Sequence, residues 1–237
     1  MLIALIIILL FLNLILWSDI FYRQFFKRFY DVVLSLFALI VLGIPLLIVS
    51  ILVRKDVGSP ILFKQHRIGK GNKEFSMYKF RSMSNERDEN GIYLPDEQRI
   101  TKLGSFLRKS SVDELPSLIN IIKGDMSIIG PRPLPTRYLP RYTEEQRRRH
   151  EVRPGLSSPS TANGRNAQTW EHQFEGDVWY VDHLSLFVDV KSILDTIRVV
   201  LSHSGATADD GGARGEFVGT ASVEDLVSDS EGNYMKL

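Results

Sequence analysis

The fold of this chain depends first on one uncharged stretch, VVLSLFALIVLGIPLLIVSILV, at residues 32–53. A plain helix through it would cross a bilayer, but would place Arg28 and Arg54 on opposite sides, against the preference for basic residues on the cytoplasmic side. Pro45 removes a backbone hydrogen bond in the middle of the stretch and clashes with the preceding turn. A helix broken there would enter one leaflet and return. These residues alone leave both arrangements open.

A second apolar stretch, Leu2–Trp17, lacks the basic region and the small-residue cleavage site of a secretory signal. We expect a retained membrane helix that rises only ~24 Å against a ~30 Å hydrocarbon core, so it either spans marginally or lies partly in the interface. Residues 18–31 mix basic and aromatic side chains, which is typical of the headgroup layer. Together these stretches exclude an ordinary cytosolic globular protein.

The net charge of +1 over 237 residues hides a basic body and an acidic tail. Residues 204–237 hold seven acidic and two basic side chains, a net charge of −5, which leaves +6 for the rest. A basic body suits anionic membrane lipid and phosphate-bearing ligands, whereas the composition of the tail is typical of disorder. The absence of cysteine excludes disulfide scaffolds and thiolate zinc sites, and the five scattered histidines make a zinc site unexpected.

The region after the uncharged stretch predicts a mixed α+β domain. Partial alternation predicts strands at Ile61–Arg67 and Glu74–Phe80, joined by a turn at Gly69–Asn72. Apolar periodicity from Gly104 to Lys123 predicts amphipathic helices that are interrupted near Pro116 and end at Gly124. Three further expectations are an extended proline-rich loop at Gly130–Pro140, a charged helix at Thr143–His150 and an apolar helical segment at Trp179–Leu201.

Carboxylates and guanidinium groups concentrate within residues 107–133. If Pro116 lies in the first turn of a helix, Asp113 and Glu114 precede its N-terminus, where the helix dipole favours ionised carboxylates by ~0.3–1 kcal/mol. An ionised aspartate is suited to act as a nucleophile or a Mg²⁺ ligand. Ser111 and Glu114 could instead form an ordinary capping box. The neighbouring arginines favour a site for phosphate and metal over a simple cap.

Seven blocks of sequence occur in the order and spacing of a known family. They are Phe63–Gly69, Tyr78–Met83, Leu107–Pro116, Lys123–Pro133, Arg153–Gly155, Asn163–Asn166 and Trp179–Asp182. With these blocks the chain resembles the bacterial monotopic phosphoglycosyl transferases from about Lys27 to Ser202. The resemblance implies a membrane-associated α+β domain with a re-entrant helix at 32–53, amphipathic interfacial helices and a small β-hairpin.

The resemblance also implies a reaction. A phosphosugar passes from a UDP-sugar, which we expect to be an N-acetylated amino sugar, to undecaprenyl phosphate, and UMP is released at the cytoplasmic face of the bacterial inner membrane. By the same resemblance Asp113 is the nucleophile and a Mg²⁺ ligand, while Glu114 assists the acceptor phosphate or orients Asp113. Charge neutralisation on the substrates is expected first from Arg108 and Arg132. Further candidates for substrate binding are Lys79, Arg81, Arg153 and Arg165.

We therefore divide the chain into an N-terminal membrane or interfacial segment (1–26), a transferase domain (27–203) and an acidic tail (204–237). The expected partners are the UDP-sugar, undecaprenyl phosphate and anionic membrane lipid, without nucleic acid, in the initiation of glycoconjugate assembly. The sequence departs from the family at Ile44-Pro45, where Ser-Pro is usual, and across Ser157–Ala162. It predicts neither the oligomeric state nor the pathway.

Two other hypotheses remain open from the sequence. One is a membrane-anchored adaptor whose basic helices bind anionic lipid and whose acidic tail recruits partners. The other is a family member that binds the nucleotide sugar without turnover, which the altered stretch Ser157–Ala162 keeps open and the intact pair Asp113-Glu114 opposes. The adaptor predicts binding that does not depend on Mg²⁺ or on this pair of carboxylates.

Overall fold

The computed structural model describes residues 19–159, 169–202 and 215–219, together with Ile6 and the short strands β5 (Leu226–Ser228) and β6 (Tyr234–Lys236). The predicted helix at Leu2–Trp17 therefore lies outside the described residues except for Ile6, as do Arg165 and residues 160–162 of the altered stretch Ser157–Ala162.

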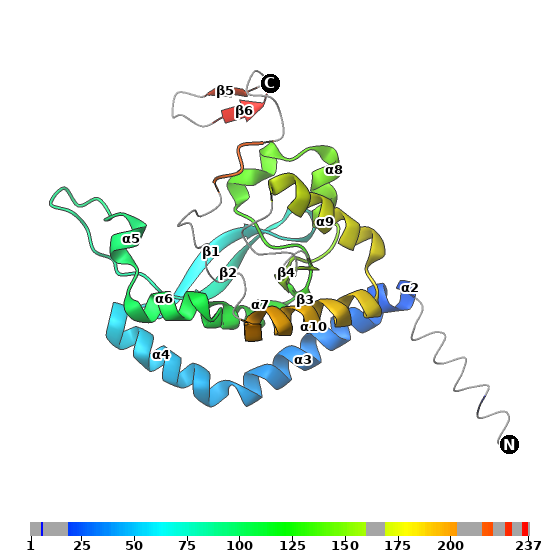
Figure 1. Ribbon diagram of the computed structural model, residues 1–237, viewed down its shortest axis with the longest axis horizontal. Coiled ribbons are helices and arrows are strands. Elements are labelled where there is room, and N and C mark those ends of the chain that lie inside the picture. The colour runs from blue at the N-terminus through cyan, green and yellow to red at the C-terminus, as the bar shows by residue number, and fades with distance from the viewer. Residues whose placement is uncertain are drawn as a thin grey trace.

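A bent helical pair lies along one side of the domain (Figure 1). It begins with α2 (Asp19–Phe21) and the π-helical turn η1 (Tyr22–Phe26), continues through α3 (Lys27–Val41) and ends with α4 (Gly43–Val57). Within the described ranges, no single helix is both long and apolar enough to cross a membrane, whereas this pair reaches that length together and bends by 66° at its break. The break predicted within residues 32–53 is thus present.

The position of Pro45 explains how the break forms without the usual serine. Leu42, between α3 and α4, has φ −89° and ψ 2°, and its N–H donates to the Ala38 carbonyl at 2.8 Å. Pro45 lies in the first turn of α4, where its missing N–H leaves no hydrogen bond unmade. The bend therefore costs few backbone hydrogen bonds.

The remaining elements follow in chain order. They are β1 (Leu62–Ile68), η2 (Lys70–Asn72), β2 (Glu74–Phe80), α5 (Asp96–Arg99), α6 (Lys102–Lys109), η3 (Val112–Ser117), α7 (Leu118–Lys123), β3 (Ser127–Ile129), η4 (Thr136–Arg141), α8 (Glu144–Arg147), η5 (Arg148–His150), β4 (Gly155–Ser157), α9 (Trp170–His183) and α10 (Leu186–Ser202). β1 and β2 form an antiparallel hairpin, and β3 pairs with β4 in parallel. The α+β class is confirmed.

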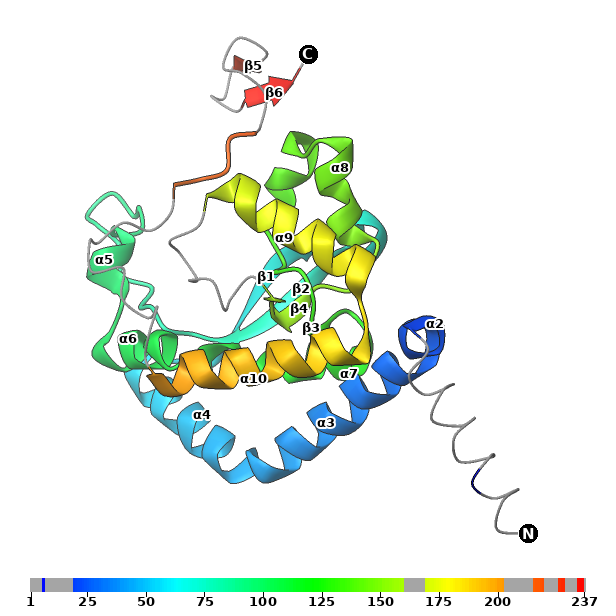
Figure 2. The same cartoon turned by 45° about the vertical axis from the view of Figure 1, so that its right-hand side comes forward.

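Helices α6, α7 and α10 lie between the bent pair and the β1–β2 hairpin, while α8 and α9 cover the far side of the domain (Figures 1 and 2). The inner face of α3 is polar and buried, and it holds this middle layer. Lys27 Nζ binds Asp189 Oδ2 on α10 at 2.6 Å, and Asp31 Oδ1 accepts from the Ile128 N–H in β3 at 2.9 Å. Strand β3 is therefore fixed to the bent pair.

Most of the predicted elements are confirmed, with two corrections. The predicted hairpin is present, and the helical run stops at Gly124, which takes the left-handed conformation at φ 98°. The expected extended loop is wrong over η4, because proline fixes φ at a value that a short 3-10 helix also uses. The apolar segment expected from Trp179 belongs to two helices, since α9 starts at Trp170.

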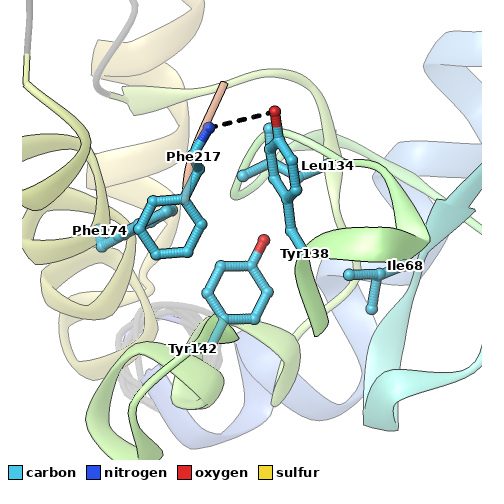
Figure 3. Close-up of a cluster of buried hydrophobic side chains, with 6 residues drawn as sticks. All are labelled: Ile68, Leu134, Tyr138, Tyr142, Phe174 and Phe217. Carbon is cyan, nitrogen blue, oxygen red and sulfur yellow. Dashed lines mark hydrogen bonds between the residues drawn. The ribbon is translucent and has the colours of Figure 1, made fainter. Parts of the chain in front are cut away.

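An aromatic cluster closes the side of the domain under α9 (Figure 3). Its buried members are Ile68, Leu134, Tyr138, Tyr142, Phe174 and Phe217. Phe217 belongs to the acidic tail, yet it is only 2% exposed. The expectation of a disordered tail is therefore wrong for residues 215–219, because an aromatic ring within the polar composition finds an apolar groove.

Candidate active site

A cavity of about 1140 Å³ lies between the β1–β2 hairpin, α6, η3, the β3–β4 pair and α10. Six of the residues predicted for the site line it: Lys79, Arg81, Arg108, Asp113, Glu114 and Arg132. The chain therefore brings together groups that are more than fifty residues apart in sequence.

The two carboxylates occupy the first turn of η3, a 3-10 helix that leads directly into α7. Ser111 precedes it in the left-handed conformation, at φ 58°, and its side chain makes no capping hydrogen bond. The alternative of a Ser111–Glu114 capping box is therefore wrong. A 3-10 geometry places successive side chains about 120° apart, so Asp113 and Glu114 point in different directions and meet different partners.

Glu114 is held by two cations. Its Oε1 accepts from Lys79 Nζ at 2.7 Å and from Arg132 Nη2 at 3.1 Å, and its side chain is 15% exposed. Burial alone would raise the pKa of this carboxyl, but the charges and hydrogen bonds of Arg132 and Lys79 lower it to about 2. Glu114 is therefore ionised at any physiological pH and forms ion pairs with both Lys79 and Arg132.

Asp113 is buried but unpaired. The residue is 8% exposed, and within the described ranges no hydrogen bond or ion pair engages its carboxylate. Burial and the neighbouring negative charge of Glu114 raise its pKa, while Lys79, Arg108 and Arg132 act in the opposite direction. A carboxylate in this state has both oxygens available for a metal ion or for attack on an electrophile.

Arg108 is positioned by a close helix contact. Its Nε donates to Ser82 Oγ at 2.8 Å, across the gap between α6 and the end of the hairpin. The gap is so narrow that a Cβ on Gly104 would lie 1.9 Å from the Ser82 carbonyl oxygen. Glycine is thus required at this position to bring Arg108 to the cavity wall.

Arg81 enters the cavity wall from the end of β2. It is 8% exposed, and its Nη1 donates to the Pro60 carbonyl at 3.1 Å. Its Nη2 is buried without a partner among the described residues. A buried donor of this kind is costly unless a ligand oxygen satisfies it.

Two predicted residues are not on the cavity wall. Arg153 donates from Nε to the Gly124 carbonyl at 2.8 Å, where it caps the C-terminal end of α7. This bond joins the segment before β4 to the end of α7. Arg165 lies outside the described residues.

Asn120 is a supporting residue that the sequence analysis missed. It is fully buried; its Oδ1 accepts from the Tyr78 N–H at 3.0 Å, and its Nδ2 donates to the Ser76 carbonyl at 2.8 Å. These bonds satisfy backbone groups of Ser76 and Tyr78 in β2 and join that strand to α7. In the sequence, Asn120 could have been recognised as a buried hydrogen-bonding residue because it is the single polar side chain within Leu118–Ile122.

The rest of the cavity wall combines an aromatic and an apolar part that the sequence analysis also missed. The guanidinium carbons of Arg87 and Arg99 lie 3.8 and 4.5 Å from the centroid of the Tyr93 ring. On another side α10 contributes Ile193 and Ile197. The cavity thus offers a cationic wall beside an apolar one, which suits a ligand with both phosphate and hydrocarbon parts.

The donor set suits a divalent cation only with help from a ligand. No group of three or more acidic or histidine side chains gathers as a metal site in the described part of the chain. Asp113 is the unpaired carboxylate of the cavity, and Mg²⁺ commonly binds one or two carboxylates together with water and substrate phosphates. The residues present therefore fit Mg²⁺ held jointly by Asp113 and a phosphorylated substrate.

Residues 22–203 match the model of the bacterial sugar transferase family, and the chain belongs to this family. It is 48% identical over 197 residues to the uncharacterized sugar transferase EpsL of Bacillus subtilis, which covers 83% of this chain and 98% of that protein. It is 35% identical over 190 residues to the UDP-N-acetylgalactosamine-undecaprenyl-phosphate N-acetylgalactosaminephosphotransferase of Aeromonas hydrophila. It is 34% identical over 200 residues to the undecaprenyl-phosphate galactose phosphotransferase of Salmonella typhimurium.

The last two alignments cover 77% of this chain, but only 45% and 42% of those relatives. The similarity therefore concerns less than half of each of these longer proteins, and nearly all of EpsL.

Proposed function

We propose that this chain is a phosphoglycosyl transferase that moves a sugar 1-phosphate from a UDP-sugar to undecaprenyl phosphate. The observation that carries the proposal is the different pairing of two adjacent carboxylates. Glu114 is held by Lys79 and Arg132, whereas Asp113 faces the same cavity unpaired. The names of the Aeromonas and Salmonella relatives supply the reaction class.

The reaction would proceed in two displacements at phosphorus. An Asp113 carboxylate oxygen attacks the β-phosphorus of the UDP-sugar; the bond from that phosphorus to the bridging oxygen breaks, and UMP leaves with the electron pair. The sugar phosphate is then bound to Asp113 as an acyl phosphate. A phosphate oxygen of undecaprenyl phosphate attacks the same phosphorus, which releases the Asp113 carboxylate and forms a diphosphate-linked sugar lipid.

Each displacement brings an anion toward an anion, so the site must neutralise charge. Lys79, Arg108 and Arg132 line the same cavity as Asp113, and their positive charges oppose the rise in its pKa that burial and Glu114 cause. Mg²⁺ held by Asp113 and the diphosphate would add charge neutralisation at the leaving UMP. Glu114 keeps Lys79 and Arg132 at the site and prevents them from pairing with Asp113.

A membrane location for the bent pair is part of the proposal. Ile40 and Ile44, on either side of the break, are 79% and 75% exposed, a cost that an apolar surrounding would remove. Arg28 and Arg54 lie toward the two ends of the pair, as a helix that enters and leaves on the cytoplasmic face requires. The acceptor lipid would then reach the apolar wall of the cavity from the membrane.

The sugar is proposed as an N-acetylated amino sugar. The Aeromonas relative is named for such a sugar, whereas the Salmonella relative is named for galactose. A panel that includes UDP-N-acetylgalactosamine, UDP-N-acetylglucosamine, UDP-galactose and UDP-glucose covers both possibilities.

The test is UMP release by the detergent-solubilised full chain, supplied with undecaprenyl phosphate, Mg²⁺ and each UDP-sugar in turn. We expect UMP from at least one donor, its loss with EDTA, and its loss in Asp113→Asn. Glu175→Gln is the matched control, because Glu175 is an exposed acid on α9 away from the cavity. No UMP from any donor, or equal UMP release by Asp113→Asn and Glu175→Gln, would contradict the proposal.

A further inference from the structure

The segment Gly215–Gly219 lies beyond residues 22–203, which match the family, yet it is seated in a groove built from that domain. The groove is formed by η4, by Tyr142 and by the first turns of α9 (Figure 3). Neither the proposed reaction nor the family match assigns a purpose to this contact.

The Phe217 side chain fills the groove. Its ring is stacked on Tyr142, with centroids 5.6 Å apart and planes inclined by 22°. It meets Phe174 and Tyr138 edge-on, at centroid distances of 4.9 and 5.7 Å. Contacts on three sides bury the ring to 2% exposure, which is the packing of a core residue rather than of a surface tail.

Polar groups at the rim recognise the segment around the ring. Glu216 Oε1 pairs with Arg137 Nε and with Arg141 Nη1, both at 2.9 Å. Arg141 Nη1 also donates to the Phe217 carbonyl at 2.6 Å, and Trp170 Nε1 donates to the Gly215 carbonyl at 3.0 Å.

The Phe217 N–H in turn donates to the Tyr138 hydroxyl oxygen at 3.3 Å, as the dashed line in Figure 3 marks. Backbone and side chains of the segment are thus both bound. The groove therefore binds an acidic residue followed by an aromatic one, Glu216 and Phe217.

The groove is connected to the cavity by a buried arginine. The hydroxyl of Tyr142, on which Phe217 stacks, accepts from Arg149 Nη1 at 3.1 Å. Arg149 Nη2 donates to the Arg132 carbonyl at 2.8 Å. Three contacts, the ring stack and these two hydrogen bonds, therefore lead from the docked ring to the backbone of an arginine whose side chain holds Glu114.

We propose that Gly215–Gly219 is a tethered peptide ligand of the η4–α9 groove, and that its docking sets the position of Arg132. Only 12 residues separate it from the end of α10, so its effective concentration at the groove is high and a weak intrinsic affinity is sufficient for docking. The effect on Arg132 rests on the proposed function, whereas the docking itself does not.

The docking is tested by hydrogen exchange in the full chain. In Phe217→Ala we expect the amides of 138–142 and 170–174 to exchange at least about tenfold faster, because the ring that closes the groove is gone. Val218→Ala is the matched control, since Val218 is 50% exposed, and its exchange should equal that of the unmodified chain. Phe217→Leu keeps an apolar side chain and should give an intermediate rate.

A synthetic peptide of residues 213–221, ARGEFVGTA, supplies the second measurement. It should bind the Phe217→Ala chain and restore slow exchange, whereas the same peptide with alanine at the phenylalanine should bind at least about tenfold more weakly. Equal binding of the two peptides, or no binding of either, would overturn the proposal. Faster exchange of Phe217→Ala that is spread equally over α6 and α7 would also overturn it, because the segment would then not act at the groove.

The consequence for the site is measured separately. Phe217→Ala should lower kcat for UMP release by about two- to tenfold, and the unmodified peptide should restore it. A chain without transferase activity would refute the proposed function and leave the docking measurements valid. Confirmed docking with unchanged kcat would instead refute the effect on Arg132 alone.

Discussion

Asp113 and Asp177 are both buried carboxylates beside arginines, but only one of them is paired. Asp177 is fully buried, and its Oδ2 accepts from Arg149 Nε at 3.1 Å and from Arg149 Nη2 at 2.6 Å. Asp113 lines the cavity, and within the described ranges it has no such partner. Burial and nearby positive charge are common to the two acids, so the presence or absence of a direct partner is the property that separates them.

The two clusters are joined through one residue. The Arg132 side chain holds Glu114 at the cavity, and its carbonyl accepts from Arg149 in the paired cluster. The paired cluster thus fixes the backbone from which the cavity cation extends. Under the proposed function, the Asp177 cluster stabilises the backbone that carries the proposed reactive cluster around Asp113.

The largest expected effect separates the two acids by activity. Asp113→Asn should lower kcat by about 10³-fold or more, since it removes the proposed nucleophile. Its melting temperature should stay equal or rise. Because the pKa of Asp113 is raised in the folded state, this group stabilises the fold at pH values below its ordinary pKa. That stabilisation is lost as the pH rises through the folded pKa, so the ionised carboxylate destabilises the fold at neutral pH. A clear fall in melting temperature would place Asp113 with the structural acids.

The second effect is the opposite one for the paired acid. Asp177→Asn leaves Arg149 buried without its counter-charge and should destabilise the domain by about 3–5 kcal/mol. Thermal unfolding of the solubilised protein measures this loss. Glu175→Gln, on the same helix and exposed, should leave the melting temperature unchanged, and an equally mild effect of Asp177→Asn would remove the contrast between the two clusters.

A smaller effect concerns how Glu114 tunes its neighbour. The acidic limb of kcat/KM should report Asp113, because Glu114 has a pKa of about 2 and stays ionised. Glu114→Gln removes a negative charge and releases Lys79 and Arg132, which both lower the pKa of Asp113. The limb should therefore move about one pH unit lower in this variant. A limb that stays in place or moves higher would contradict this account of the pair.

The smallest effect tests the support of a single cation. Ser82→Ala removes the acceptor that holds Arg108 Nε and should lower kcat/KM by about two- to fivefold without a change in melting temperature. Ser84→Ala, in the same loop, is the matched control. Equal kcat/KM values for Ser82→Ala and Ser84→Ala would show that the orientation of Arg108 does not depend on Ser82.

Much of the fold follows from local sequence patterns. The alternation of apolar and polar residues predicts the β1–β2 hairpin, and the uncharged stretch with its proline predicts the break between α3 and α4. These features depend on residues close together in the chain. The burial of Phe217 is not predictable from the sequence, because a single aromatic residue in an acidic tail belongs to no periodic pattern. The groove that buries it is formed by η4 and α9, which are distant in sequence.

The site was predicted in part for the same reason. The pair Asp113-Glu114 and the nearby arginines are close in sequence, so their concentration was visible. The pairing of Glu114 rather than Asp113 is not predictable in this way, because its partner Lys79 comes from β2, thirty-five residues earlier. Arg153 is a different case, because its sequence block gives no sign that its Nε donates to the Gly124 carbonyl at the end of α7.

The most direct test of the unpaired carboxylate is to trap what forms on it. The full chain is incubated with its UDP-sugar and Mg²⁺ without the acceptor lipid, quenched in acid and analysed by peptide mass spectrometry. We expect a mass increase of one sugar phosphate on the peptide that contains Asp113, absent in Asp113→Asn and removed by undecaprenyl phosphate. An adduct on Glu114, or UMP release with acceptor present but no adduct under any condition, would contradict it.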